Sequence, residues 1–210
     1  MNTHDGTVRI IAVAGPPGSG KSTLCDALAQ RLGDAVVVPM DHYQRMTSLP
    51  IEAVERWLER GADHDELPVP HLAEHLALLK AGQPVIDPRT GRTVAPRAHI
   101  VFETHFGRAH AGTGAYIDAL VWLDTPLDVA LLRNLRSFLQ PLLQPGLAAD
   151  ALREELRWID QYLVNHDAVV RRLLQLQAAR VRAGADLVLA GGHAQDMVDE
   201  VMAWLAGRPV

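Results

Sequence analysis

The residues with the clearest chemical role lie in a glycine-rich segment near the N-terminus, Gly15-Pro16-Pro17-Gly18-Ser19-Gly20-Lys21-Ser22-Thr23. The segment fits the pattern G-x-x-x-x-G-K-[ST], in which backbone N–H groups surround the phosphates of a nucleotide. In such a loop Lys21 would reach the β- and γ-phosphates, and the Ser22 hydroxyl would ligate Mg²⁺. We therefore expect the whole segment to bind a nucleoside triphosphate, with Mg²⁺ as its partner ion.

The elements on either side of this loop are those that the pattern requires. Val8–Ala14 is short and apolar throughout, which predicts a buried strand, and Ser22–Leu32 has a helical apolar pattern that Gly33 ends. The helix would direct its unpaired N–H groups and the positive end of its dipole toward the phosphates. A chance glycine-rich turn between strand and helix is the alternative, and it leaves the match at every fixed position unexplained.

Apolar runs typical of central strands alternate with helical patterns along the chain. Further strands are expected at 35–38, 99–102, 119–123 and 186–189, and further helices at 51–60, 72–81, 127–139, 149–162, 167–183 and 195–205. This alternation predicts an α/β, three-layer P-loop NTPase fold with a central, mostly parallel five-stranded sheet and helices on both faces. We expect one domain over 1–210 with a small hairpin insertion at about 84–95 and a helix break at 140–146. Core positions are expected for Trp57, Trp122, Trp158 and Trp204.

Composition limits the class of protein. The 210 residues carry a net charge of −5, which argues against a broadly basic nucleic-acid binder, and the single cysteine, Cys25, excludes an internal disulfide. No apolar run reaches the roughly 18 residues that a membrane-spanning helix needs, and residues 1–6 lack the pattern of a signal peptide. We expect a cytoplasmic protein without a nucleic-acid or membrane partner, and the sequence leaves the oligomeric state open, a homo-oligomer included.

Asp41 is the first candidate catalytic group outside the loop. It follows the apolar run Val36–Met40 and would therefore lie at the carboxyl edge of the sheet, near the phosphates. A carboxylate there can accept the proton of an attacking hydroxyl group and orient that hydroxyl toward the γ-phosphate. A turn-capping role for Asp41 explains its position equally well.

From about Val8 to Leu205 the layout of the chain resembles the P-loop kinases of the uridine kinase, phosphoribulokinase and pantothenate kinase family. In that family the second strand leads to an aspartate followed by aromatic residues, which matches Asp41 and Tyr43 and implies that both lie against the substrate. His42 stands where uridine kinases usually carry other residues. The resemblance implies ATP as the phosphoryl donor and a small-molecule alcohol, such as a nucleoside or a sugar-like or pantothenate-like alcohol, as the acceptor.

Two further motifs follow the family's order. The run at 99–103 resembles an apolar strand that ends in glutamate, which implies that Glu103 lies near Mg²⁺ or the substrate. Asp124-Thr125-Pro126, followed by Arg133 and Arg136, resembles the segment that leads to a short helical lid, expected at about 133–148. Lid arginines stabilise charge on the transferring phosphoryl group, and these two are three residues apart on one helix face. A solvated arginine pair is the alternative.

Other polar residues are weaker candidates for the site. His105 and Arg108 follow the third strand and are candidates for substrate contact, although a solvated loop explains them equally well. The run from His71 to His75 matches the metal motif H-x-x-E-H, but it lacks a clear third ligand, so a polar helix face is the better interpretation. In the hairpin, Arg89 and Arg92 could contact an anionic group of a substrate, and a plain surface turn is the alternative.

The activity that these residues predict is ATP-dependent phosphoryl transfer to an alcohol. The expected catalytic residues are Lys21, Asp41, Arg133 and Arg136, with Ser22 and Glu103 at the metal. A nucleotide-dependent switch or assembly ATPase without a small acceptor is the alternative, because a phosphate-binding loop occurs in both classes. The chain has no N-K-x-D motif of the kind that selects guanine in known GTPases, which favours ATP over GTP.

Overall fold

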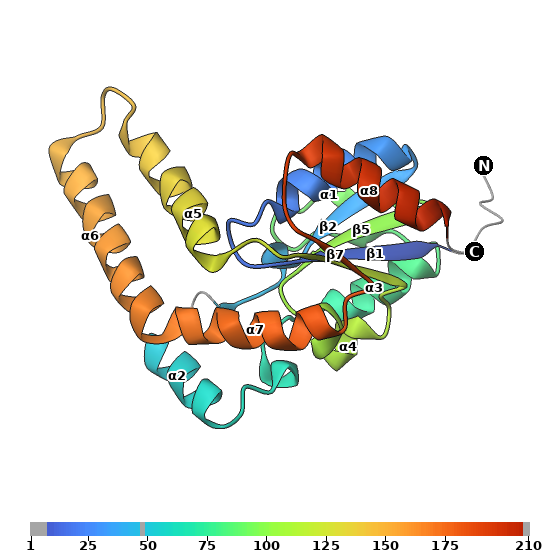
Figure 1. Cartoon of the computed structure of the whole chain (residues 1–210), viewed down its shortest axis with the longest axis horizontal. Coiled ribbons are helices and arrows are strands. Elements are labelled where there is room, and N and C mark those ends of the chain that lie inside the picture. The colour runs from blue at the N-terminus through green and yellow to red at the C-terminus, as the bar shows by residue number, and fades with distance from the viewer. Residues whose placement is uncertain (1–7, 47–48, 208–210) are drawn as a thin grey trace.

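The computed structural model describes residues 8–46 and 49–207. Its centre is a five-stranded sheet with strand order β2-β5-β1-β6-β7, in which every pairing is parallel. The strands are β1 (Arg9–Ala14), β2 (Ala35–Pro39), β5 (His99–Thr104), β6 (Ala119–Leu123) and β7 (Leu187–Leu189). Because the strands run in the same direction, the segments that follow β1, β2 and β5 meet at one edge of the sheet (Figure 1).

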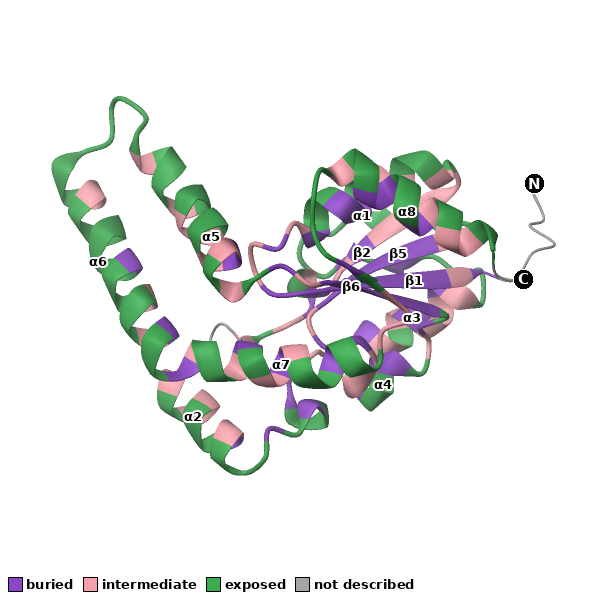
Figure 2. Ribbon diagram, viewed as in Figure 1, coloured by how far each residue is buried: buried purple, intermediate pink, exposed green. Residues whose placement is uncertain are grey.

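Helices cover both faces of this sheet. The helices α1 (Lys21–Leu32) and α8 (Ala194–Ala206) pack on one face, and α3 (Leu72–Lys80) and α7 (Arg171–Ala183) pack on the other (Figure 1). Successive side chains of a strand point to opposite faces, so each face has its own core. Ile10 packs with Leu76 of α3, whereas Ile11 packs with Leu24 of α1. Figure 2 shows the strands as the most deeply buried elements, and the three-layer α/β prediction is confirmed.

A helical hairpin, which we call the arm, extends away from the sheet (Figure 1). It consists of α5 (Leu127–Leu142) and α6 (Ala149–Asn165), and α6 continues through the π-helical turn η5 (His166–Val170) into α7. The short lid expected at 133–148 is therefore part of a longer element. The helix break expected at 140–146 is present but begins later than expected, because α5 continues through Pro141 to Leu142 and α6 begins at Ala149. Proline removes one backbone hydrogen bond, and the carbonyl left unpaired belongs to the exposed Ser137, where water can bind it.

Smaller elements surround the carboxyl edge. The strands β3 (Val85–Ile86) and β4 (Thr93–Val94) pair antiparallel in the hairpin expected there. The remaining elements are the 3₁₀ turns η1 (Met40–His42), η3 (His64–Glu66) and η4 (Gly107–Ala109), and the helices α2 (Ile51–Glu59) and α4 (Ala111–Gly114).

Three of the four tryptophans occupy the core as expected. Trp57 and Trp122 are buried, and Trp204 packs against the core from a partly buried position. The prediction for Trp158 is wrong: its side chain is 50% exposed on the arm. The apolar face of α6 that suggested burial instead forms an aromatic cluster in which Trp158 stacks on Tyr162.

Candidate active site

The glycine-rich loop turns tightly between β1 and α1. Gly18 and Gly20 have φ values of 80° and 99°, a region that glycine adopts without a steric penalty. A Cβ at Gly18 would lie 2.1 Å from the carbonyl oxygen of Ala130, so the loop packs directly against the first turns of α5. Ser19 Oγ is buried and has no hydrogen-bond partner among the residues that the structure describes. The loop therefore fits a chain of phosphates, which would supply an acceptor for this hydroxyl.

Lys21, at the first position of α1, is almost completely buried. Its side chain is 5% exposed, and its Nζ donates a hydrogen bond of 3.1 Å to the Pro16 carbonyl oxygen across the loop. Burial lowers the pKa of Lys21, and the nearby carboxylates of Glu103 and Asp41 offset part of that shift. The ammonium group is thus held inside the loop at the place where the β- and γ-phosphates of a nucleotide would bind.

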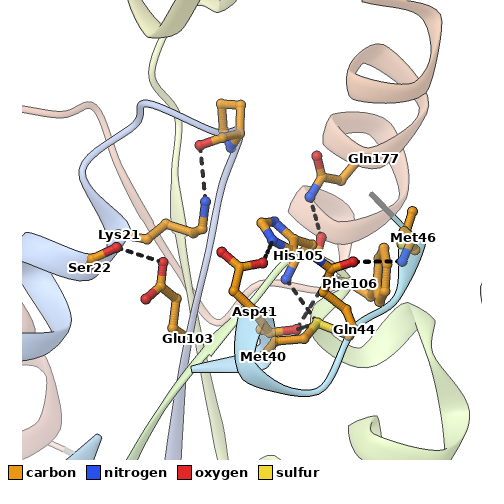
Figure 3. Close-up of polar contacts among 12 residues, drawn as sticks. Lys21, Ser22, Met40, Asp41, Gln44, Met46, Glu103, His105, Phe106 and Gln177 are labelled. Atoms are coloured by element: carbon orange, nitrogen blue, oxygen red, sulfur yellow. Dashed lines mark hydrogen bonds and ion pairs between the residues drawn. The ribbon is translucent and has the colours of Figure 1, made fainter. Parts of the chain in front are cut away.

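Ser22 and Glu103 come together at the same edge. Glu103 lies on β5 beside Val13 of β1, and its Oε1 accepts a hydrogen bond of 2.9 Å from Ser22 Oγ. Figure 3 shows this pair next to Lys21. A hydroxyl and a carboxylate oxygen are hard ligands of the kind that Mg²⁺ prefers. These two residues fit a magnesium ion bound to a nucleotide, as the sequence predicts.

Asp41 lies in η1, directly after β2, and its carboxylate stands between Lys21 and the ring of His105 (Figure 3). His105 Nε2 donates to Asp41 Oδ1 over 2.8 Å. This hydrogen bond is the main cause that holds the pKa of Asp41 below its ordinary value, and burial opposes the shift. Asp41 is therefore an ionised carboxylate at neutral pH. The structure brings Asp41 and His105 together, whereas the sequence only predicted that each lies near the substrate.

His105 is held from its backbone as well. Its carbonyl oxygen accepts a hydrogen bond from Gln177 of α7, and its N–H points at the sulfur of Met40, the residue before Asp41 (Figure 3). The ring of His105 is thus positioned by β5, η1 and α7 together. Gln177 had no signal in the sequence, because a buried glutamine that binds a loop carbonyl belongs to no motif.

The two residues after Asp41 also bind polar partners. His42 Nδ1 lies 2.5 Å from Asp87 Oδ2 in the hairpin, and Tyr43 forms a hydrogen bond of 3.1 Å with His75 Nδ1 of α3. Burial raises the pKa of Asp87, but the hydrogen bonds from His42 and from neighbouring backbone groups outweigh it and lower the pKa. Burial and the Asp87 charge raise the pKa of Tyr43 to about 12. Tyr43 is 3% exposed and is one of the residues that line the cleft at this edge of the sheet.

A cleft of about 1080 Å³ opens from these residues toward the arm. Pro17 of the loop, Asp41 and His105 line one end, and the inner face of the arm lines the other with Asn134, Phe138, Trp158, Gln161, Tyr162 and Asn165. Phe138, Trp158 and Tyr162 pack against one another, and Asn134 Nδ2 donates to Tyr162 Oη over 2.9 Å. The sequence analysis missed this face, although the four-residue spacings Asn134/Phe138 and Trp158/Tyr162 are a signal for it.

Three arginines that the sequence analysis assigned to the site do not line the cleft in the described structure. Arg133 and Arg136 lie on α5 and are exposed, and the described cleft lining includes their neighbour Asn134 rather than either arginine. The prediction that Arg108 contacts substrate is wrong. Its guanidinium group donates to Asp186 Oδ2 over 2.7 Å and to the Gly184 carbonyl oxygen over 2.9 Å. Both partners precede β7 and lie at the amino edge of the sheet, away from the phosphate-binding loop.

The H-x-x-E-H motif from His71 to His75 forms no metal site in the part of the chain that the structure describes. His71 lies 3.6 Å from Glu74, and His75 binds Tyr43. Within residues 8–46 and 49–207, no group of three or more His, Cys, Asp and Glu side chains could hold a metal ion.

In the same part of the chain, no helix has the length and apolar character needed to cross a bilayer. Residues 1–6, which bear on the signal-peptide expectation, lie outside the described ranges.

The fold and the loop define a P-loop nucleotide-binding protein, and comparisons with known proteins give its relatives. A family model described as "AAA ATPase domain" matches residues 2–145, more than half of the chain, and the chain belongs to that family. The uridine kinase of Chloroflexus aurantiacus (strain ATCC 29366 / DSM 635 / J-10-fl) is 28% identical over 198 residues, which cover 87% of each chain.

Two further proteins are similar to this chain, one in sequence and one in structure. The uridine kinase of Shewanella baltica is 36% identical over 142 residues, which cover 60% of this chain and 66% of the relative. A shikimate kinase from Acinetobacter baumannii superimposes with a TM-score of 0.50 at 20% identity, over 95% of this chain and 94% of that one. The uridine kinase relatives confirm the resemblance to P-loop kinases of the uridine kinase group, and the shikimate kinase supports the fold alone.

Proposed function

We propose that this chain is an ATP-dependent kinase that transfers the γ-phosphoryl group to a hydroxyl group of a small molecule. The observation that carries the proposal is the position of Asp41: an ionised carboxylate faces Lys21 across the mouth of the phosphate-binding loop and opens onto a cleft. A carboxylate in this position can bind the acceptor hydroxyl, orient its oxygen toward the phosphate and take its proton.

The other groups have supporting roles in this proposal. The loop and Lys21 bind the phosphates and place the γ-phosphoryl group in front of Asp41. Ser22 and Glu103 would hold Mg²⁺, which neutralises phosphate charge when it is bound. The hydrogen bond from His105 lowers the pKa of Asp41 and fixes the orientation of its carboxylate. Arg133 lies within the stretch of α5 that packs on Gly18, and we propose that Arg133 and Arg136 approach the transferring group when the arm moves toward the loop.

Hydrolysis of ATP without a small acceptor is the second candidate function, and the match to the AAA ATPase domain family favours it. The experiment that separates the two measures ADP formation from Mg²⁺-ATP with and without a panel of nucleosides, sugars, sugar phosphates and pantothenate. The kinase proposal requires that one acceptor stimulates ADP formation and becomes phosphorylated. Basal hydrolysis that no acceptor changes, and that Asp41→Asn leaves intact, would favour the ATPase.

A further inference from the structure

Exposed apolar side chains are concentrated on the arm. The part of the chain that the structure describes has eleven large apolar side chains that are exposed, and eight of them lie between residues 132 and 164. Of these eight, Trp158 alone lines the cleft. Figure 2 shows the arm standing away from the sheet with most of its surface exposed. Because soluble monomers rarely expose a contiguous apolar patch larger than roughly a few hundred Å², this surface indicates a partner.

Five of the exposed side chains form a stripe on the side of the arm that faces away from the cleft. Each of them is turned by about 100° or more from every cleft-lining side chain of its own helix, at 3.6 residues per turn. Spacings of seven and four residues return to the same side of a helix, so the members on each helix share one face. We call this surface the leucine stripe, and it consists of Leu132, Leu139 and Leu143 at α5 and of Leu156 and Leu163 on α6.

The contact between α5 and α6 within one arm does not use the leucine stripe. Phe138 packs against Trp158 and Tyr162, and Asn134 donates to Tyr162. Ile159 is the buried residue of α6, at 8% exposure, whereas the stripe leucines are 38% to 81% exposed. Apolar side chains at these spacings are typical of a helix face that packs against other helices.

We infer that the leucine stripe is a dimer interface, on which the stripe of a second copy of this chain packs. A twofold interface uses the same surface of both copies, so one stripe per chain is enough to form it. After Asp128, α5 carries two arginines and no carboxylate, whereas α6 carries four carboxylates and two arginines. These opposite net charges favour α5 of one copy against α6 of the other. The inference does not depend on the proposed kinase activity, because the cleft lies on the other side of the arm.

The size of the arm sets the strength of this dimer. The 17 residues of α6 give a length of about 25 Å, and two helices side by side give a width of about 20 Å. The face therefore offers about 500 Å² per copy, or about 1,000 Å² in total, which is the lower limit for a specific interface. We expect a dimer with a Kd in the micromolar range that dissociates on dilution.

Sedimentation velocity of the full chain between about 1 and 200 µM tests the inference. We expect a reversible monomer–dimer equilibrium in the wild type. A double variant that combines Leu139→Gln with Leu156→Gln is expected to weaken the dimer at least about tenfold, because it removes apolar contacts from both helices. Ile86→Gln is the matched control, since Ile86 is also exposed but lies in the β3–β4 hairpin.

Thermal unfolding followed by circular dichroism checks that these variants fold, which exposed positions should permit. A wild type that stays monomeric up to about 200 µM overturns the inference and leaves the stripe to a different partner. A double variant that dimerises as tightly as the wild type also overturns it, because the dimer would then use another surface.

Reversal of charge on α6 tests the pairing of α5 with α6. Glu155 and Asp160 are exposed on α6 and are not among the residues that line the cleft. We expect Glu155→Lys combined with Asp160→Lys to weaken the dimer about tenfold or more at low salt, because both helices then carry a positive net charge. The control combines Asp26→Lys with Glu200→Lys, two exposed positions on α1 and α8 that change the total charge equally. Equal dimerisation of the two double variants would overturn this pairing.

Discussion

His105 Nε2 and Asp41 Oδ1 lie 2.8 Å apart, although 64 positions separate the two residues in the chain. Parallel pairing of β2 with β5 brings them together, because Pro39 is in register with Glu103, so the segments that follow the two strands leave the sheet side by side. The pair joins a carboxylate that can accept a proton to an imidazole whose hydrogen bond lowers the pKa of that carboxylate. It is the arrangement on which the proposed chemistry depends most directly.

Asp41→Asn keeps the size of the side chain but removes its ability to accept a proton. We expect kcat for acceptor phosphorylation to fall about 10²- to 10⁴-fold, while ATP binding stays within a few-fold of wild type. Asp26→Asn is the control, since Asp26 is exposed on α1. Steady-state kinetics and nucleotide titration measure both quantities. Full activity of Asp41→Asn would remove Asp41 from the reaction.

His105→Asn removes the hydrogen bond that chiefly lowers the pKa of Asp41. The kinase needs Asp41 ionised, so activity is lost as pH falls through the pKa of Asp41. Without His105 that pKa rises, and we expect the acid limb of the kcat–pH profile to move to higher pH. The exposed His193 provides the control variant His193→Gln. An acid limb that stays in place in His105→Asn would show that His105 does not act through Asp41.

We expect Lys21→Met to lower catalytic activity without lowering the stability of the fold. Because one cation that binds the phosphates is lost, we expect kcat to fall about 10²- to 10³-fold. The pKa of Lys21 in the folded chain lies below its ordinary value. Between these two pKa values the unfolded chain binds more protons than the folded chain does. The free energy of unfolding of the wild type therefore rises with pH across that range. We expect Lys21→Met to be at least as stable as wild type at neutral pH and to lose this rise.

Denaturant unfolding at several pH values from neutral to alkaline measures that effect. A variant that is clearly less stable than wild type at pH 7 would contradict the expectation and would mean that the Lys21 contacts stabilise the empty loop.

Gly18→Ala and Gly20→Ala test how tightly the loop packs on the arm. Both positions have positive φ, so each alanine costs about 1–2 kcal/mol in backbone strain. At Gly18 the new Cβ would also meet the Ala130 carbonyl oxygen, whereas at Gly20 nothing lies within 4 Å. We expect Gly18→Ala to lower the free energy of unfolding by about 1–3 kcal/mol more than Gly20→Ala. Equal losses would mean that α5 moves away from the loop easily.

Arg108→Gln tests the structural role that replaces the predicted contact with substrate. The change removes the ion pair with Asp186 and the hydrogen bond to Gly184. We expect the free energy of unfolding to fall by about 1–2 kcal/mol, with KM for the acceptor unchanged. Chemical denaturation and steady-state kinetics on the same preparation measure the two effects. A raised acceptor KM at unchanged stability would return Arg108 to the substrate site.

The sequence by itself predicted the P-loop, the five parallel strands and the residues that end them. Those features depend on local patterns: the spacing of glycines around Lys21, and short apolar runs that are buried on both faces. The same runs placed Asp41 and Glu103 at the carboxyl edge, because every strand of a parallel sheet ends on the same side.

The tertiary structure alone decided which polar groups meet. The pairing of His105 with Asp41 depends on strand order, and the diversion of Arg108 to Asp186 depends on where β7 begins. Trp158 looked like a core residue because an apolar helical face has the same period whether it is buried or lines a cleft. Local sequence sets which face of an element is apolar, whereas contacts between distant elements determine what that face meets.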